Sequence, residues 1–147
     1  MIIHNKTVLV YDIEVFPNVF SCTLKNSETG QVKVYELSHR KDNIVEETKQ
    51  MVKLFQDDRY LFCGYNNIHY DNPIMNFIIE NVGSMPNNYQ KVCNRIFRLS
   101  QQIVTSETSE SWNQWKYATK FATLDLLTML FYKNMKVTLT VGFSMRR

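Results

Sequence analysis

Short apolar runs alternate with turn-forming clusters in the first part of the chain and predict strands. Residues 6–12 read Lys-Thr-Val-Leu-Val-Tyr-Asp, a β-branched run that is typical of a strand in the middle of a sheet. Residues 19–25 and 31–37 predict two further strands, and the cluster Asn-Ser-Glu-Thr-Gly at 26–30 favours a tight turn between them. These three segments are expected to pair as hairpins.

The next segment has helical spacing and a helix start signal. Asn43 and Glu46 form a capping-box pattern. One stripe of apolar or methyl-bearing residues follows, at Ile44, Val45, Thr48, Met51, Val52 and Phe55. Residues 60–65, Tyr-Leu-Phe-Cys-Gly-Tyr, then predict a fourth strand. A strand, a helix and a strand in this order favour a crossover connection, which makes the fourth strand parallel to the first.

Two more helices and one more strand are expected after residue 70. The triplet 71–73, Asp-Asn-Pro, favours a helix start because proline has no N–H group to lose in the first turn. A second helix is predicted over 88–103, a polar loop over 105–111 and a fifth strand over 117–124. Asp125 is expected to cap a short helix after that strand.

Composition agrees with one packed α/β domain over residues 1–147. Apolar residues make up 44% of the chain and aromatic residues 13%, and Gly and Pro together number seven, which excludes disordered and collagen-like classes. No apolar run approaches the roughly 18 residues of a membrane span. Three distant cysteines without a Cys-x-x-Cys motif argue against a disulfide framework or zinc module and favour a reducing, cytoplasmic setting. We therefore expect a mixed five-stranded sheet flanked by helices.

Charge is divided unevenly along the chain. Residues 1–90 hold 8 Lys or Arg against 11 Asp or Glu, and residues 91–147 hold 9 against 3. An enzyme that uses metal ions to act on a polyanion needs this combination, because carboxylates hold the cations while Lys and Arg hold the phosphates. A chance gradient on a solvated surface is the alternative.

The end of the first predicted strand carries a pair of carboxylates. Asp12 and Glu14 are two residues apart, so that they project from the same face of a strand. Two like charges this close are unfavourable unless a cation neutralises them, and oxygen ligands of this kind suit Mg²⁺ or Mn²⁺. Alternatively, both side chains point into solvent.

A third carboxylate, Asp71, follows the loop after the fourth predicted strand. Ligands of parallel sheets bind at the carboxyl ends of the strands. If the first and fourth strands are neighbours, Asp71 therefore converges with Asp12 and Glu14 on one edge. Three converging carboxylates suit a one- or two-ion site for phosphodiester hydrolysis. Asp71 can equally serve as a helix cap.

Two segments resemble motifs of a known enzyme family. Residues 10–14, Val-Tyr-Asp-Ile-Glu, resemble the first motif of the DEDD (DnaQ-like) 3′–5′ exonucleases. Residues 64–71, Gly-Tyr-Asn-Asn-Ile-His-Tyr-Asp, resemble the second motif in its family-B DNA polymerase form. The similarity covers roughly residues 7–135, and the asparagine-rich, aromatic style is similar to bacteriophage proteins. It implies a ribonuclease-H-like sheet, with three antiparallel strands followed by parallel strands and with helices on both faces.

The resemblance also implies roles for individual residues and a substrate. Asp12, Glu14 and Asp71 would be the catalytic metal ligands for Mg²⁺ or Mn²⁺ in the hydrolysis of single-stranded DNA from its 3′ end. Four residues would contact or support the substrate strand: Phe16 at its terminal base, Asn66, Tyr70 beneath the site, and His69 near a phosphate. His69 is equally compatible with polar surface. A phage-encoded protein of this kind would work in the cytoplasm of the host cell.

The family's third motif, Tyr-x-x-x-Asp or His-x-x-x-x-Asp, is missing. No Asp or Glu follows Asp125, and the nearest imitation, residues 132–136, ends in a lysine. We therefore expect an exonuclease domain that is incomplete at its C-terminus and lacks the polymerase domain. Three interpretations stay open. The chain is a nuclease that is weak or completed by another chain, such as the remainder of a split DNA polymerase. Alternatively, it is a catalytically impaired module that binds nucleic acid or a host protein as a decoy or inhibitor, or it is a fragment with no separate role.

Two basic or aromatic groups in the second part of the chain are further candidates for phosphate or base binding. Lys91, Arg95 and Arg98 fall on one face of the predicted helix over 88–103. That face is compatible with phosphate binding or with simple solvation. Trp112 and Trp115 are three residues apart and suit either base stacking or core packing.

Overall fold

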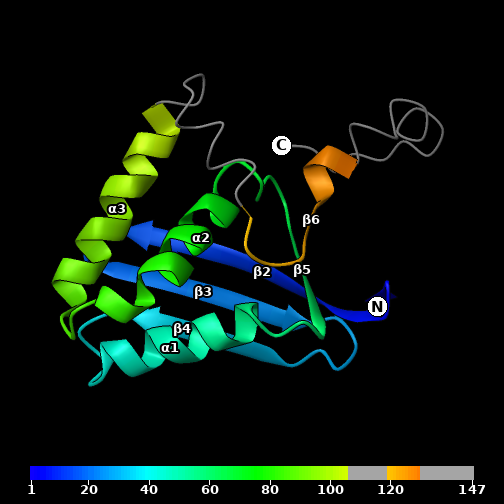
Figure 1. The fold of residues 1–147 in the computed structure, drawn as a ribbon, viewed down its shortest axis with the longest axis horizontal. Helices are drawn as coiled ribbons and strands as arrows, with labels where there is room; N and C mark the ends of the chain where they lie inside the picture. The colour runs from blue at the N-terminus through cyan, green and yellow to red at the C-terminus, as the bar shows by residue number, and fades with distance from the viewer. Residues whose placement is uncertain (106–118, 130–147) are drawn as a thin grey trace.

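The computed structural model describes residues 1–105 and 119–129, which form a mixed sheet with helices packed on it (Figure 1). The strands are β1 (Ile2–Ile3), β2 (Lys6–Phe16), β3 (Val19–Asn26), β4 (Val32–Leu37), β5 (Tyr60–Gly64) and β6 (Thr123–Asp125). The helices are α1 (Ile44–Phe55), α2 (Asp71–Asn81) and α3 (Tyr89–Thr105), with one 3₁₀ turn, η1 (Val82–Ser84). Residues 126–129 continue from β6 as a helical turn.

The strand order confirms the predicted fold class, an α/β ribonuclease-H-like sheet. The order is β4-β3-β2-β5-β6, with β1 paired to β2. Strands β2, β3 and β4 are antiparallel neighbours, whereas β2, β5 and β6 are parallel. The crossover through α1 therefore places β5 directly beside β2, as the strand–helix–strand order predicts.

The sheet has six strands rather than the expected five, because β1 folds back on β2. Ile2 and Ile3 pair with Thr7 and Lys6 through a turn at His4 and Asn5, which adopt positive φ angles of 52° and 64°. The fifth strand, predicted over 117–124, matches β6 only at residues 123 and 124: residues 119–122 do not form a strand, and 117–118 lie outside the described residues. Residues 106–111 of the predicted loop, and Trp112 and Trp115, lie outside the described residues.

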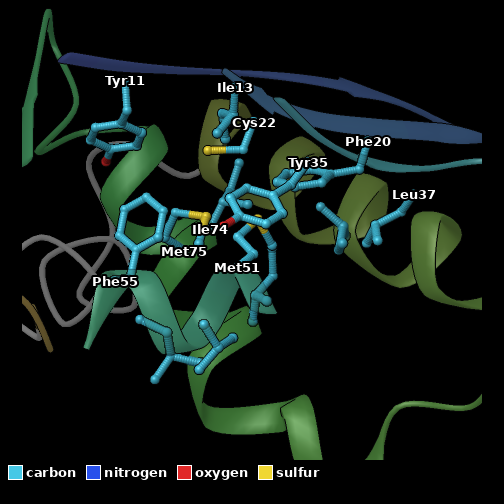
Figure 2. Close-up of a cluster of buried hydrophobic side chains, with 14 of the residues drawn as sticks. Tyr11, Ile13, Phe20, Cys22, Tyr35, Leu37, Met51, Phe55, Ile74 and Met75 are labelled. Atoms are coloured by element: carbon cyan, nitrogen blue, oxygen red, sulfur yellow. The ribbon is translucent and has the colours of Figure 1, made fainter. Parts of the chain in front are cut away.

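The main core lies between one face of the sheet and the helices α1, α2 and α3 (Figure 2). Figure 2 shows side chains from the strands, such as Tyr11 and Ile13, pointing toward side chains from the helices, such as Met51 and Ile74. The opposite, outer face of the sheet carries a smaller buried cluster of Val8, Leu61 and Cys63, against which Leu126 packs. Side chains along β2 therefore alternate between the two faces: Leu9, Tyr11 and Ile13 are buried on the inner face, whereas Val10, Asp12 and Glu14 are exposed on the outer face.

The start of α1 shows how a predicted cap is realised. The Asn43 side-chain oxygen accepts a hydrogen bond from the Glu46 backbone N–H at 2.9 Å. The Glu46 carboxylate accepts instead from the Gln50 side chain at 2.8 Å. The Asn43 cap is therefore confirmed, and Glu46 stabilises the helix through an i, i+4 contact.

Candidate functional site

The carboxyl end of β2 extends beyond the end of β5 and forms one wall of the candidate site. Pairing between the two strands runs from Thr7 opposite Tyr60 to Val10 opposite Cys63. Residues 11–16 of β2 therefore pass beside the loop that follows β5. In this stretch Asp12 and Glu14 are exposed on the outer face, as the alternation predicts.

Asp71 is the first residue of α2, and its carboxyl group is held close to Asp12. The residue is only 7% exposed. Burial raises the pKa of the Asp71 carboxyl group to about 7, and the Asp12 carboxylate is the next largest cause of this rise. Hydrogen bonds from the backbone N–H groups of Ile13 and of Asp71 itself lower this pKa. The Asp12 carboxylate is thus close enough to disfavour the charge on Asp71.

The structure does not support the alternative interpretation of Asp71 as a helix cap. The residue at the cap position of α2 is Tyr70, and no side chain makes a capping hydrogen bond there. The Asp71 carboxyl group instead accepts hydrogen bonds from the backbone N–H of Ile13 on β2 and from its own N–H.

Tyr70 links this loop to α3 and to the other β2 carboxylate. Its ring is half-buried against the main core. Burial raises the pKa of the Tyr70 hydroxyl, a hydrogen bond with Ser100 lowers it, and the Asp71 and Glu14 carboxylates raise it. Glu14 is therefore close enough to Tyr70 for its charge to disfavour ionisation of the hydroxyl.

The remaining predicted substrate residues lie at the end of β2 and in the loop between β5 and α2. Phe16 is 52% exposed at the end of β2. Asn66 has a positive φ of 60°, and its backbone N–H is engaged by Asp125. His69 is half-buried in the same loop.

Asp125 fixes the loop between β5 and α2, a role that sequence reasoning missed. This residue is 3% exposed at the end of β6. Its carboxylate accepts hydrogen bonds from the backbone N–H groups of Asn66 at 2.8 Å and Ile68 at 3.0 Å. It also accepts from Leu127 N–H at 2.9 Å, which confirms the predicted cap of the helical turn that follows. Both carboxylate oxygens accept hydrogen bonds, so that Asp125 holds the loop in place.

A network of buried amide and hydroxyl groups lies beneath the same loop. The Tyr11 hydroxyl donates to the Asn72 side-chain oxygen. The Asn67 and Asn72 side-chain amides both donate to the Thr123 hydroxyl, at 2.9 and 3.0 Å, and this hydroxyl donates to the Phe62 carbonyl at 3.1 Å. The network ties β2, β5, α2 and β6 together, because unsatisfied polar groups are costly in a buried position.

Gly64 permits this close packing of the loop. A Cβ atom at Gly64 would lie 2.9 Å from the Cβ and Cγ atoms of Asn67. Any side chain at this position would therefore push Asn67 out of the hydrogen-bond network. The glycine in the motif-like segment 64–71 is required by this contact.

The Asp125→Asn variant is expected to lose about 2 kcal/mol of stability, because charge-assisted hydrogen bonds to three backbone N–H groups become neutral and one oxygen becomes a donor. Amide hydrogen exchange is expected to accelerate selectively at Asn66 and Ile68. Chemical unfolding and exchange measured by NMR check both effects. Asp42→Asn, in an exposed position before α1, serves as the control. Unchanged protection at Asn66 and Ile68 would show that Asp125 does not hold the loop.

The described carboxylates offer a partial donor set for a divalent ion. Within residues 1–105 and 119–129, no three His, Cys, Asp or Glu side chains are grouped closely enough to hold a metal ion. The pair Asp12 and Asp71 remains, in which the Asp12 charge disfavours ionisation of Asp71 and no cationic partner lies within ion-pair distance among the described residues. Such a pair fits a hard cation, which removes the repulsion.

Comparison with known proteins gives similarity in fold only. No protein-family model matches the chain, and no curated protein matches its sequence. The ExoI/SSB-Ct complex aligns with 98% of this chain and 33% of its own, at 15% identity and a TM-score of 0.45. E. coli exonuclease I in complex with a 5cy-dA13 oligonucleotide aligns with 95% of this chain and 32% of its own, at 15% identity and a TM-score of 0.44. A product-bound exonuclease I aligns with 86% of this chain and 31% of its own, at 15% identity and a TM-score of 0.40. The chain spans about a third of the length of these proteins.

No helix within the described residues has both the length and the apolar character needed to cross a membrane. This agrees with the absence of a long apolar run in the sequence.

Proposed function

We propose that this chain is a 3′–5′ exonuclease-like domain that hydrolyses single-stranded DNA with the help of Mg²⁺ or Mn²⁺. The observation that carries the proposal is the closeness of the buried Asp71 carboxyl group, at the start of α2, to the exposed Asp12 carboxylate on β2. The two residues lie 59 positions apart in the sequence, and they belong to the two segments that resemble exonuclease motifs. A buried carboxylate beside another carboxylate is unfavourable without a cation.

Asp12, Glu14 and Asp71 are the residues that would hold the ion. A divalent ion at such a site supplies charge neutralisation for the phosphate and lowers the pKa of an attacking water. The chain's own contribution is positional: Asp125 and the Asn67–Asn72–Thr123 network hold the loop that carries Asp71.

The substrate strand is proposed to approach across the same edge. Phe16 offers an exposed aromatic ring at the end of β2 for stacking on the terminal base. Asn66, His69 and Tyr70 belong to the neighbouring loop, and Tyr70 is held from beneath by Ser100. Asn66 and His69 are proposed to contact the strand.

A second function, nucleic-acid or protein binding without turnover, is favoured by one specific observation. Asp125 already accepts hydrogen bonds on both of its carboxylate oxygens, and no other Asp or Glu follows it in the sequence given. We infer that a further acidic group, such as one from the remainder of a DNA polymerase, would complete the site. Without it, the domain would bind single-stranded DNA or a host protein without cleaving it.

Digestion of labelled single-stranded DNA in the presence of Mn²⁺ tests the proposal. The wild type is expected to shorten a 5′-labelled strand progressively and to release label at once from a 3′-labelled one. Asp12→Ala is expected to abolish both, whereas Asp42→Ala, which removes an exposed carboxylate away from the site, is expected to retain them. A wild-type protein that binds the strand without degrading it would establish the binding module instead. Degradation that survives Asp12→Ala would overturn the proposed site.

A further inference from the structure

The outward face of α3 carries three cations and no carboxylate. Lys91, Arg95 and Arg98 follow one another at intervals of four and three residues, and the helix sequence from 89 to 105 contains no Asp or Glu. Their face lies opposite the buried stripe, which includes Val92, Ile96 and Ile103. Among the described residues, no carboxylate lies within ion-pair distance of any of the three cations.

The three cations line one hollow together with amide side chains. The hollow has a volume of about 560 Å³ and is lined by Pro86, Gln90, Lys91, Asn94, Arg95 and Arg98. Gln90 and Asn94 add neutral hydrogen-bond donors to the positive charges. Guanidinium, ammonium and amide donors converging on one hollow fit the oxygen atoms of an anion.

Arg95 is held in place by its neighbours on α2. Its guanidinium group lies 5.5 Å from the centre of the Phe77 ring, and one of its N–H groups donates to the Asn81 side-chain oxygen at 3.4 Å. A cation that is already oriented loses less conformational freedom when it binds a ligand. The hollow is therefore partly preorganised.

A second hollow, beside α1, provides a contrast within the same molecule. It has a volume of about 390 Å³ and is lined by Lys49, Val52, Lys53, Gln56, Asp57 and Val82. Two lysines are present there, but Asp57 lies in the same lining and Glu46 and Glu47 lie on the same helix. The α1 hollow has mixed charge, whereas the α3 hollow has only positive charge.

Helix α3 also reaches the candidate site. Figure 1 shows α3 beside the end of β2, and Ser100 of α3 is hydrogen-bonded to Tyr70 in the site loop. Arg98 is exposed one half-turn of the helix before the buried Ser100, so a strand bound at the site would reach it by passing over the outer side of α3. Lys91 lies about 10 Å farther along the helix axis. This length corresponds to about three stacked nucleotides at about 3.4 Å each.

We propose that Lys91, Arg95 and Arg98 form a phosphate-binding surface for the backbone of single-stranded nucleic acid bound at the candidate site. This inference rests on the proposed function for the nature of the partner. The contacts involve phosphates rather than bases, so that the surface is expected to bind all sequences alike.

Fluorescence anisotropy of labelled oligothymidylate and oligoadenylate, measured in EDTA over a range of salt concentrations, tests this surface. The double variant Lys91→Gln/Arg98→Gln is expected to bind both strands about tenfold more weakly. The slope of log K against log salt is expected to shrink by about 1.4, at about 0.7 for each lost phosphate contact. The charge-retaining variant Lys91→Arg/Arg98→Lys is expected to bind like the wild type, which excludes a folding defect as the cause.

The matched control is Lys49→Gln/Lys53→Gln, which removes the same charge from exposed positions of α1. It is expected to leave affinity within about twofold of the wild type, because its hollow has mixed charge. Equal effects of the two double variants would overturn the inference and leave the proposed function standing. If Lys91→Gln/Arg98→Gln weakens binding of an oligoglutamate peptide but not of the oligonucleotides, the inference is also overturned, and the surface binds an acidic protein partner instead. A wild type that binds neither oligonucleotide would contradict the proposed function itself.

Discussion

The Asp71→Asn variant is expected to be more stable than the wild type above about pH 7 when no divalent ion is present. Burial and the neighbouring Asp12 carboxylate raise the pKa of Asp71 from its ordinary 3.8 to about 7 in the folded protein. Between these two values the folded state keeps a proton that the unfolded state has released. The free energy of unfolding therefore falls as the pH rises through this window. The full shift corresponds to on the order of 4 kcal/mol, and asparagine avoids this loss because it cannot ionise.

Chemical unfolding of both proteins between about pH 4 and about pH 8 measures this effect. The difference between wild type and variant is the informative quantity. Glu36 and Asp57, whose pKa values are lowered to about 2 by Arg40 and Arg59, contribute equally to both proteins. A difference that stays constant across the window would show that Asp71 is not buried beside Asp12.

Adding Mn²⁺ is expected to reverse the order of stability if the proposed metal site is correct. A ligand that binds only the folded state at about 100 times its Kd stabilises it by about 2.7 kcal/mol. Only the wild type retains the Asp71 carboxylate, so only the wild type is expected to gain this stabilisation. An equal shift in both proteins would place manganese binding elsewhere.

Phe62→Ala is expected to destabilise the fold by about 3–5 kcal/mol, the cost of a large cavity in a packed core. Phe62 has no exposed surface and stacks on Phe55 with ring centres 4.2 Å apart. Tyr11 and Phe121 contact it edge-on, with ring centres 6.3 and 5.7 Å away. Its carbonyl also accepts from Thr123 in the network beneath the site. The expected loss of stability therefore has three sources: less buried apolar surface, fewer aromatic contacts and a disturbed strand β5.

The midpoint of guanidinium chloride unfolding measures the effect of Phe62→Ala. Phe16→Ala is the matched control, because it removes the same side chain from a half-exposed position on β2. The control is expected to change stability by no more than about 0.5 kcal/mol. A loss below about 1 kcal/mol for Phe62→Ala would mean that the aromatic cluster does not contribute to the core.

The sequence was sufficient to predict those features that depend on local pattern. The β-branched run of β2, the capped helix α1 and the run of β5 follow one another in the order that produces a parallel pair. The closeness of Asp12 and Asp71 then follows from topology, because Asp12 lies near the carboxyl end of β2 and Asp71 follows the loop at the carboxyl end of the neighbouring β5. The start of α3 at Tyr89 likewise follows from the apolar stripe of that helix.

Features that depend on distant backbone contacts could not be predicted in this way. The partners of Asp125 are N–H groups in a loop 59 and 57 residues earlier, and a backbone N–H leaves no mark in the sequence. Strand β1 was missed because its turn uses positive φ angles at His4 and Asn5, where no glycine marks the turn. The choice between a capping and a buried role for Asp71 also required the actual position of β2.

The dependence of the site loop on β6 has a consequence for the order of events during protein synthesis. A ribosome releases β2, β5 and α2 well before Thr123 and Asp125 emerge. Domain segments can begin to fold during synthesis at about 5–20 residues per second, so the antiparallel half of the sheet can form while the loop at residues 65–70 is still without its anchor. Any cleavage or binding competence at this edge must therefore be acquired only after the nascent chain has supplied β6.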